Sequence, residues 1–125
     1  MSLRDYLDSF HRAIERIEDY GFSESIDINE EIRPAKQIVN KVKIVLVDGS
    51  VLQVREYIDA KYKIEKINYA YQYHNEDGKL IFRYDNARHK PNLGFIDHKH
   101  LNDGSVVPCP MPDIADVVDE VIAHL

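Results

Sequence analysis

The residues with the greatest capacity for chemistry lie between Arg83 and His100. They form three short runs: Arg83-Tyr84-Asp85-Asn86, His89-Lys90 and Asp97-His98-Lys99-His100. Residues two apart in an extended segment point the same way, so His98 and His100 are expected to project from one surface. An unperturbed imidazole has a pKa of roughly 6.5, which lets both protonation states exist near neutral pH. The pattern therefore indicates a cluster suited to holding a metal or moving a proton.

Two imidazoles side by side support three interpretations. The first is metal binding, in which His89 or Asp85 completes a site for zinc or another divalent ion. The second is metal-free catalysis on a phosphodiester, in which one imidazole takes a ribose proton and the other gives a proton to the leaving group. In that case Arg83 or Lys99 stabilises the developing charge. The third is structural, with Asp85 and Asn86 forming a turn and the histidines bonding to backbone. Sequence physics alone favours the third.

The sequence lacks the standard catalytic signatures, such as a glycine-rich phosphate loop, a nucleophile elbow or a paired-cysteine zinc motif. Its single cysteine, Cys109, excludes an internal disulfide. No apolar run approaches the roughly 20 residues of a membrane helix, and the N-terminus lacks a signal-peptide core. We therefore expect a cytoplasmic protein without a membrane partner.

The net charge of −6 is unevenly distributed along the chain. Residues 36–100 carry +4, whereas residues 1–35 and residues 101–125 each carry −5. An anionic ligand is expected to meet the basic middle of the chain. A solvated, lysine-rich sheet face would explain the same charge distribution.

Length and periodicity predict the elements that position the cluster. A chain of 125 residues, 44% hydrophobic and 30% charged, fits a single folded domain spanning 1–125. Apolar residues recur at spacings of three and four near both ends, which predicts an N-terminal and a C-terminal amphipathic helix. Between them the sequence predicts an α+β fold with an antiparallel sheet of about five to six strands. The expected strands are 26–33, 38–47, 51–58, 62–74 and 79–85, with a short extended piece near 95–100 in an otherwise irregular stretch 86–110.

Two hairpins determine which residues share a face of the sheet. A three-residue loop at Asp48-Gly49-Ser50 would pair Leu46 with Leu52 and Ile44 with Val54, keeping one face apolar. A second hairpin around residues 75–78 predicts one aromatic and one polar face. The aromatic face would hold Ile67, Tyr69, Tyr71, Tyr73, Leu80, Phe82 and Tyr84, and the polar face Asn68, Gln72, His74, Arg83 and Asp85. Aromatic residues on a sheet can stack on nucleic-acid bases, but they more often pack under a helix.

Several of these segments resemble the TumE family of toxins from prokaryotic toxin–antitoxin modules. The resemblance is carried by Tyr71-Gln72-Tyr73-His74, by Leu80-Ile81-Phe82-Arg83-Tyr84-Asp85-Asn86-Ala87 and by His98-Lys99-His100. It extends more weakly over most of the chain, including Val54-Arg55-Glu56-Tyr57 and Phe95. It implies a growth-inhibiting toxin, a small ribonuclease that inhibits translation by cleaving messenger RNA. It also implies neutralisation by an adjacently encoded antitoxin that binds DNA.

Carried over residue by residue, the resemblance favours a functional set around the Arg-Tyr-Asp-Asn and His-Lys-His motifs. We assign His98 and His100 as acid and base, and Asp85 as the group that orients an imidazole. Arg83 and Lys99 are assigned to phosphate contacts. The remaining residues assigned to substrate binding are Tyr84, Asn86, His89, Tyr71 and Tyr73.

The expected partners are an RNA substrate and a DNA-binding antitoxin, and the sequence leaves a homodimer open. No cofactor is expected, with a divalent metal as the alternative. Two other functions remain open: a non-catalytic module that binds RNA or protein, and a metal-dependent hydrolase that uses the His-Lys-His segment.

Overall fold

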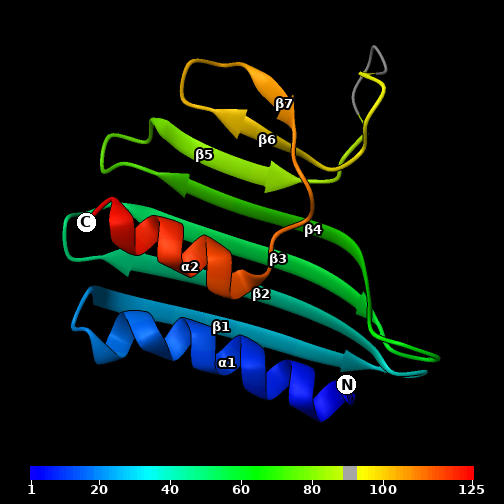
Figure 1. The fold of residues 1–125 in the computed structure, drawn as a ribbon. Helices are drawn as coiled ribbons and strands as arrows, with labels where there is room; N and C mark the ends of the chain where they lie inside the picture. The colour runs from blue at the N-terminus through cyan, green and yellow to red at the C-terminus, as the bar shows by residue number, and fades with distance from the viewer. Residues whose placement is uncertain (89–92) are drawn as a thin grey trace.

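An antiparallel meander forms the centre of the protein in the computed structural model, which describes residues 1–88 and 93–125 (Figure 1). Within these residues, seven strands pair in chain order to form one sheet. Helices α1 and α2 both cover the same face of that sheet (Figure 1). The elements are α1 (Leu3–Asp19), β1 (Ser23–Arg33), β2 (Gln37–Leu46), β3 (Val51–Asp59), β4 (Glu65–His74), β5 (Leu80–Asp85), β6 (His98–Leu101), β7 (Val106–Pro108) and α2 (Ile114–Ala123).

This arrangement confirms the α+β prediction and adds one strand to it. The additional strand, β7, comes from the stretch that we expected to be irregular because it is rich in glycine and proline. Pro108 cannot donate a hydrogen bond to a sheet, but at the outer edge of a sheet this is tolerated. Pro108 lies opposite His98, so β7 holds β6 from the side away from β5.

Helix α1 forms where the sequence predicts it. Ser2 and Asp5 make the reciprocal hydrogen bonds of a capping box, and Gly21 follows the helix with a φ of 73°. The apolar face of α1 is buried against the sheet, while α2 buries its own apolar face beside it. Arg16 of α1 reaches Asp119 of α2 at 2.5 Å. Neither α1 nor α2, the described helices, is long and apolar enough to cross a membrane.

The hairpin between β2 and β3 differs from the expected register by two residues. Leu46 donates its backbone N–H to Ser50, and Ile44 lies opposite Leu52, so the pairs Leu46–Leu52 and Ile44–Val54 were wrong. The loop is one residue earlier than expected, with Gly49 at a φ of 83°. Because side chains alternate with a period of two, a shift by two leaves every apolar residue on the expected face.

Ile67 was wrongly expected on the aromatic face of β4. A β-bulge shifts the register between Tyr57 and Ile58 of β3, so that Tyr57 pairs with Asn68 and Ile58 with Lys66. The bulge leaves Ile67 42% exposed and buries the Lys66 side chain. Beyond the bulge the expected alternation holds, and the tyrosines of β4 are buried under the helices.

A buried ion pair forms where the bulge directs Lys66 inward. Its Nζ lies 3.4 Å from Glu56, and these side chains are 7% and 0% exposed. Tyr6 donates a hydrogen bond to Glu56 at 2.6 Å, and Tyr71 also donates to this carboxylate. The cluster attaches α1 to the middle of the sheet.

We expect Glu56→Gln to lower the free energy of unfolding by about 3 kcal/mol, because it leaves a buried ammonium without its counter-charge. Urea unfolding at neutral pH measures this. The double variant Glu56→Gln/Lys66→Met should recover part of the loss, since it removes the uncompensated charge. A single variant within about 0.5 kcal/mol of wild type, the usual range of a surface substitution, would contradict the assignment.

Candidate functional site

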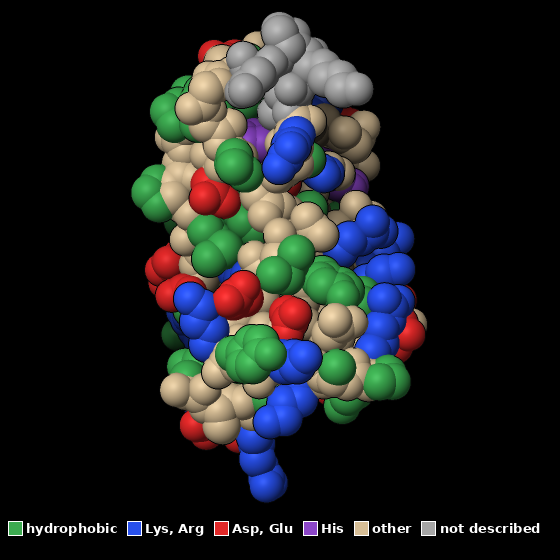
Figure 2. Space-filling model, turned by 90° about the vertical axis from the view of Figure 1, so that its right-hand side faces the viewer, with side chains coloured by type: hydrophobic (Ala, Val, Ile, Leu, Met, Phe, Trp, Pro, Cys, Tyr) green, Lys and Arg blue, Asp and Glu red, His purple; other side chains and the backbone are tan. Residues whose placement is uncertain are grey.

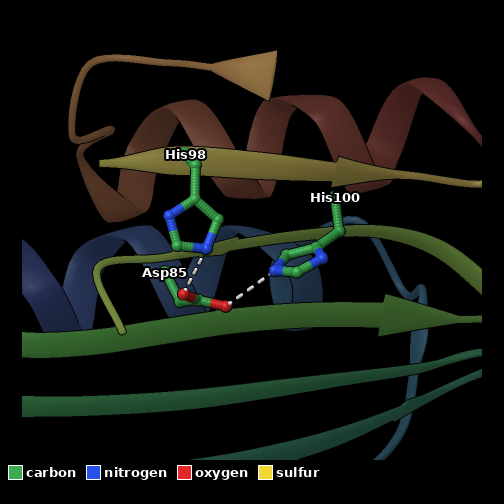
Figure 3. Close-up of side chains that lie close together, drawn as sticks. All are labelled: Asp85, His98 and His100. Atoms are coloured by element: carbon green, nitrogen blue, oxygen red, sulfur yellow. Dashed lines mark ion pairs between the residues drawn. The ribbon is translucent and has the colours of Figure 1, made fainter. Parts of the chain in front are cut away.

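The pairing of β5 with β6 brings the Arg-Tyr-Asp-Asn and His-Lys-His motifs together. Asp85 lies opposite His98, and Arg83 lies opposite His100. All of these side chains belong to the polar face of the sheet, on the side away from the helices. Figure 3 shows the two imidazoles from β6 meeting the carboxylate from β5, with Nε2 of His98 at 2.7 Å and Nε2 of His100 at 3.3 Å.

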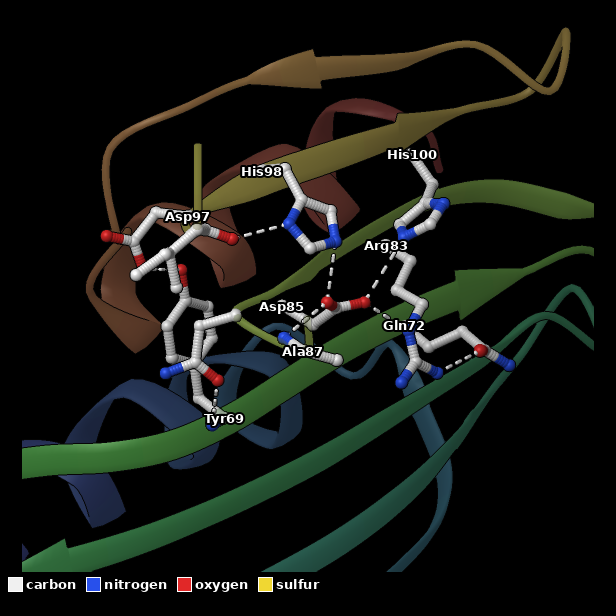
Figure 4. A network of polar contacts seen from close by, with 10 residues as sticks. Tyr69, Gln72, Arg83, Asp85, Ala87, Asp97, His98 and His100 are labelled. Carbon is white, nitrogen blue, oxygen red and sulfur yellow. Dashed lines mark hydrogen bonds and ion pairs between the residues drawn. The ribbon is translucent and has the colours of Figure 1, made fainter. Parts of the chain in front are cut away.

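The Asp85 carboxylate is the centre of the site. Within the described residues it has four nitrogen neighbours: the two imidazoles, the Arg83 Nε at 2.7 Å and the Ala87 backbone N–H at 3.0 Å. Figure 4 shows these contacts converging on its two oxygens. Burial raises the pKa of Asp85, but the Arg83 hydrogen bond, the Ala87 amide and the charge of His98 outweigh burial and hold that pKa below its usual value.

His98 is enclosed. The residue is 0% exposed, and its Nδ1 lies 2.6 Å from the Ile96 carbonyl oxygen. Because a carbonyl oxygen only accepts, Nδ1 carries a proton. The short contact between Nε2 and Asp85 is then attractive only when a second proton lies between them. His98 therefore fixes the position of the carboxylate from inside the protein.

His100 and Arg83 are the members of the site that solvent reaches. The His100 side chain is 23% exposed and the Arg83 side chain 36%. Arg83 is held by Asp85 through Nε and by Gln72 through Nη1 at 2.7 Å. Its Nη2 has no hydrogen bond to any residue that the structure describes, so this nitrogen is available to an anionic ligand. Gln72 was not among the predicted site residues, although the alternation of β4 already placed it on the polar face.

Other predicted site residues lie on the opposite face of the sheet. Lys99 and Tyr84 both contact Glu120 of α2, at 2.8 Å and 2.5 Å. Burial lowers the pKa of Lys99, but its interactions with Glu120 and Tyr84 together outweigh burial and raise that pKa above its usual value. Tyr71 and Tyr73 are 0% exposed in the core beneath the helices. Lys99 and these tyrosines are therefore separated from the histidines by the thickness of the sheet.

Asn86 supports the backbone beside the site. Its side-chain oxygen accepts the Tyr69 N–H at 3.2 Å, and its amide nitrogen donates to the Ile67 carbonyl at 2.9 Å. These bonds continue the pairing of β4 with β5 beyond the last strand residue. His89, the other predicted substrate-binding residue, lies outside the described residues.

Comparison with known families identifies the chain. A family model described as Toxin TumE matches residues 11–125. The chain belongs to the TumE toxin family. No curated protein and no solved structure matches it. Membership supports a toxin role and implies an antitoxin partner in general. The resemblance carried by the two motifs is confirmed, and the structure brings Arg83 and Asp85 of one motif beside His98 and His100 of the other.

The site of this TumE protein also offers metal ligands. One ligand atom each from Asp85, His98 and His100 lies within 4.8 Å of the others, and two imidazoles with a carboxylate suit a divalent transition metal. Two ligands on a tetrahedral zinc would be about 3.4 Å apart, given bonds of about 2.1 Å. His98 and Asp85 are 2.7 Å apart, which is a hydrogen-bond distance, and Arg83 already places a positive charge on the same carboxylate. A metal would have to separate these groups.

We expect Asp85→Asn to lower the free energy of unfolding at pH 7 by about 1–3 kcal/mol, because it weakens hydrogen bonds to a charged group. A lowered pKa means that the Asp85 carboxylate stabilises the fold above its unfolded pKa, near 3.8, and that this contribution is lost as pH falls through the lowered value. The difference between wild type and variant should therefore shrink as the pH falls below about 3.8. Urea titrations from pH 7 to pH 2 measure it, with the exposed Asp77→Asn as control. A difference independent of pH would refute the charge assignment.

Proposed function

We propose that this TumE protein is a ribonuclease toxin that inhibits translation by cleaving RNA. The observation that supports this most directly is that the half-exposed His100 on β6 lies directly opposite Arg83 on β5. An imidazole can move a proton near neutral pH, and a guanidinium can bind a phosphate oxygen. Side by side at the surface they match the two needs of phosphodiester cleavage.

The proposed reaction needs only groups at this site. The ribose 2′-oxygen attacks the phosphorus while His100 takes the proton of the 2′-hydroxyl. The bond from phosphorus to the 5′-oxygen breaks, and the imidazolium returns the proton to that oxygen. The products are a 2′,3′-cyclic phosphate and a free 5′-hydroxyl. Arg83 stabilises the extra negative charge on the phosphate oxygens through its Nη2.

Asp85 and His98 act in this proposal as positioning residues. The sequence hypothesis used both histidines as acid and base, but His98 is enclosed, and a substrate would have to displace its neighbours to touch it. Asp85 instead orients the His100 ring through Nε2 and holds the Arg83 side chain. A group whose rotamers are locked in this way is preorganised for catalysis.

A second candidate is a non-catalytic module that binds RNA or protein. The saturated hydrogen bonding of Asp85 favours it, because a fully satisfied polar cluster can serve only to join β5 to β6. In that case the toxin inhibits growth by occupying its partner. Cleavage of RNA by purified protein separates the two candidates.

The cellular setting belongs to the proposal. A toxin that cleaves messenger RNA acts in the cytoplasm, and a DNA-binding antitoxin would neutralise it by covering His100 and Arg83. These groups are close enough on the surface for one antitoxin segment to cover both.

We expect His100→Ala to reduce RNA cleavage by about 10²–10⁴-fold, the usual contribution of a general acid–base group, and to abolish growth inhibition. Cleavage of a fluorescent RNA by protein purified without a histidine tag measures the first, and induction from a repressible promoter the second. The matched control is His74→Ala, another half-buried histidine of the same sheet. Equal cleavage by wild type and His100→Ala would remove the catalytic assignment.

Chelation tests the metal alternative in the same assay. If the reaction is the metal-free one, EDTA leaves the rate unchanged. Loss of cleavage in EDTA with recovery on adding Zn²⁺ would instead assign Asp85, His98 and His100 as ligands. Growth inhibition without cleavage under any condition would favour the binding module.

A further inference from the structure

The strand registers extend the site across the polar face as two parallel rows of side chains. One row pairs Lys43 with Gln53, Gln53 with Gln72, Gln72 with Arg83, and Arg83 with His100. The neighbouring row is Lys41, Arg55, Ala70, Asp85 and His98. With strands about 4.8 Å apart, each row runs roughly 19 Å from β2 to β6. We call these the track rows.

The track rows are strongly basic up to the site. Lys41, Lys43 and Arg55 are exposed, and none of them forms an ion pair with any residue in the described part of the chain. Arg83 stands at the other end, beside His100. The acidic side chains next to this surface are on β1, where Asp27 lies opposite Lys43. Glu31 is also on β1, and its pKa is lowered mainly by Arg33, with a smaller contribution from Lys41. The acidic side chains of β1 therefore form the edge of the basic surface next to Lys41 and Lys43.

A groove follows the track rows. It has a volume of about 540 Å³, and residues of β1 through β5 line it, from Asp27 to Arg83. Ala70 lies between Arg55 and Asp85 in its row, and its small side chain leaves the floor low where larger side chains stand on both sides. Figure 2 shows Lys and Arg side chains gathered in a column along the right-hand edge of the molecule, which is the side of the sheet away from the helices.

We infer that this groove binds the phosphate backbone of single-stranded RNA and leads it to His100. The inference rests on the proposed ribonuclease function and names the surface that delivers the substrate. Charge complementarity supports an anionic chain as the occupant, because the basic groups are in register with one another and with the phosphate-binding Arg83. The amides of Gln53 and Gln72 lie between them and can bond to phosphate or sugar.

Binding along the track should be independent of base sequence. Among the described residues that line the groove, none is aromatic, so it lacks the stacking platform on which sheet proteins bind bases. The tyrosines of β4 and β5 that could have formed such a platform are buried on the other face. Contacts with phosphate therefore dominate, and affinity should fall steeply with salt.

The test uses wild-type protein and a fluorescent oligouridylate with 2′-O-methyl riboses, which cannot undergo attack by the 2′-oxygen. Fluorescence anisotropy from 0.1 to 1 M salt should give a slope of log K against log salt of about −2.8 for four phosphate contacts. Lys43→Ala/Arg55→Ala should flatten that slope by about 1.4, so that binding is about 25-fold weaker at 0.1 M salt. A 2′-O-methyl oligoadenylate should bind equally well.

The matched control is Lys61→Ala/Lys63→Ala, which removes the same charge from exposed lysines outside the groove. It should leave affinity and slope unchanged. Lys41→Ala is a second track variant, with about half the effect, and circular dichroism confirms folding of each variant. Equal binding by the track variants and wild type would overturn the inference.

Parallel cleavage assays separate this inference from the proposed function. If wild type cleaves unmodified RNA, His100→Ala does not, and the track variants bind like wild type, the ribonuclease stands and the track is wrong. If the track variants no longer bind a co-expressed antitoxin while their RNA binding is unchanged, the groove is an antitoxin-binding surface and the inference is overturned.

Discussion

The Asp85 carboxylate is the interaction on which the polar side of this protein depends. A buried carboxylate is costly unless donors surround it. Here the donors come from three directions: the neighbouring strand β6, the Arg83 side chain on its own strand and the Ala87 backbone just past the strand end. Their number and charge explain why the pKa of this carboxyl stays low despite burial. The same contacts fix the imidazole of His100 and the guanidinium of Arg83 at the surface.

The period of two along a strand divides the two motifs between the faces of the sheet. In His98-Lys99-His100 the histidines face the carboxylate, whereas Lys99 crosses to the helix side and bonds with Glu120. In the same way Tyr84 separates from Arg83 and Asp85. Side chains adjacent in sequence thus serve different purposes: one face joins the helices to the sheet, and the other presents basic and imidazole groups to solvent.

Features set by residues close together in the chain were easier to predict than features set by contacts between distant segments. The two amphipathic helices and the alternating strands depend on near neighbours in the chain, and those predictions were confirmed. The bulge that exposes Ile67 and the pairing that makes Val106–Pro108 a strand depend on partners in other strands. No local pattern marks them. Strand alternation and the pairing of β5 with β6 were enough to predict that Arg83, Asp85 and the two histidines converge. They were not enough to predict how exposed each of these side chains is.

Sequence alone determined the α+β class, the two-faced sheet and the membership of the motifs in the TumE family, because periodicity and motif order are properties of the chain itself. The tertiary structure decided which histidine solvent reaches, which lysine leaves the site and how the basic residues of β2 and β3 align with Arg83. The physical reason is that exposure and cross-strand register arise only when separate strands pack together. His98 and His100 are equivalent as an alternating pair in sequence, yet one lies inside the protein and the other at its surface.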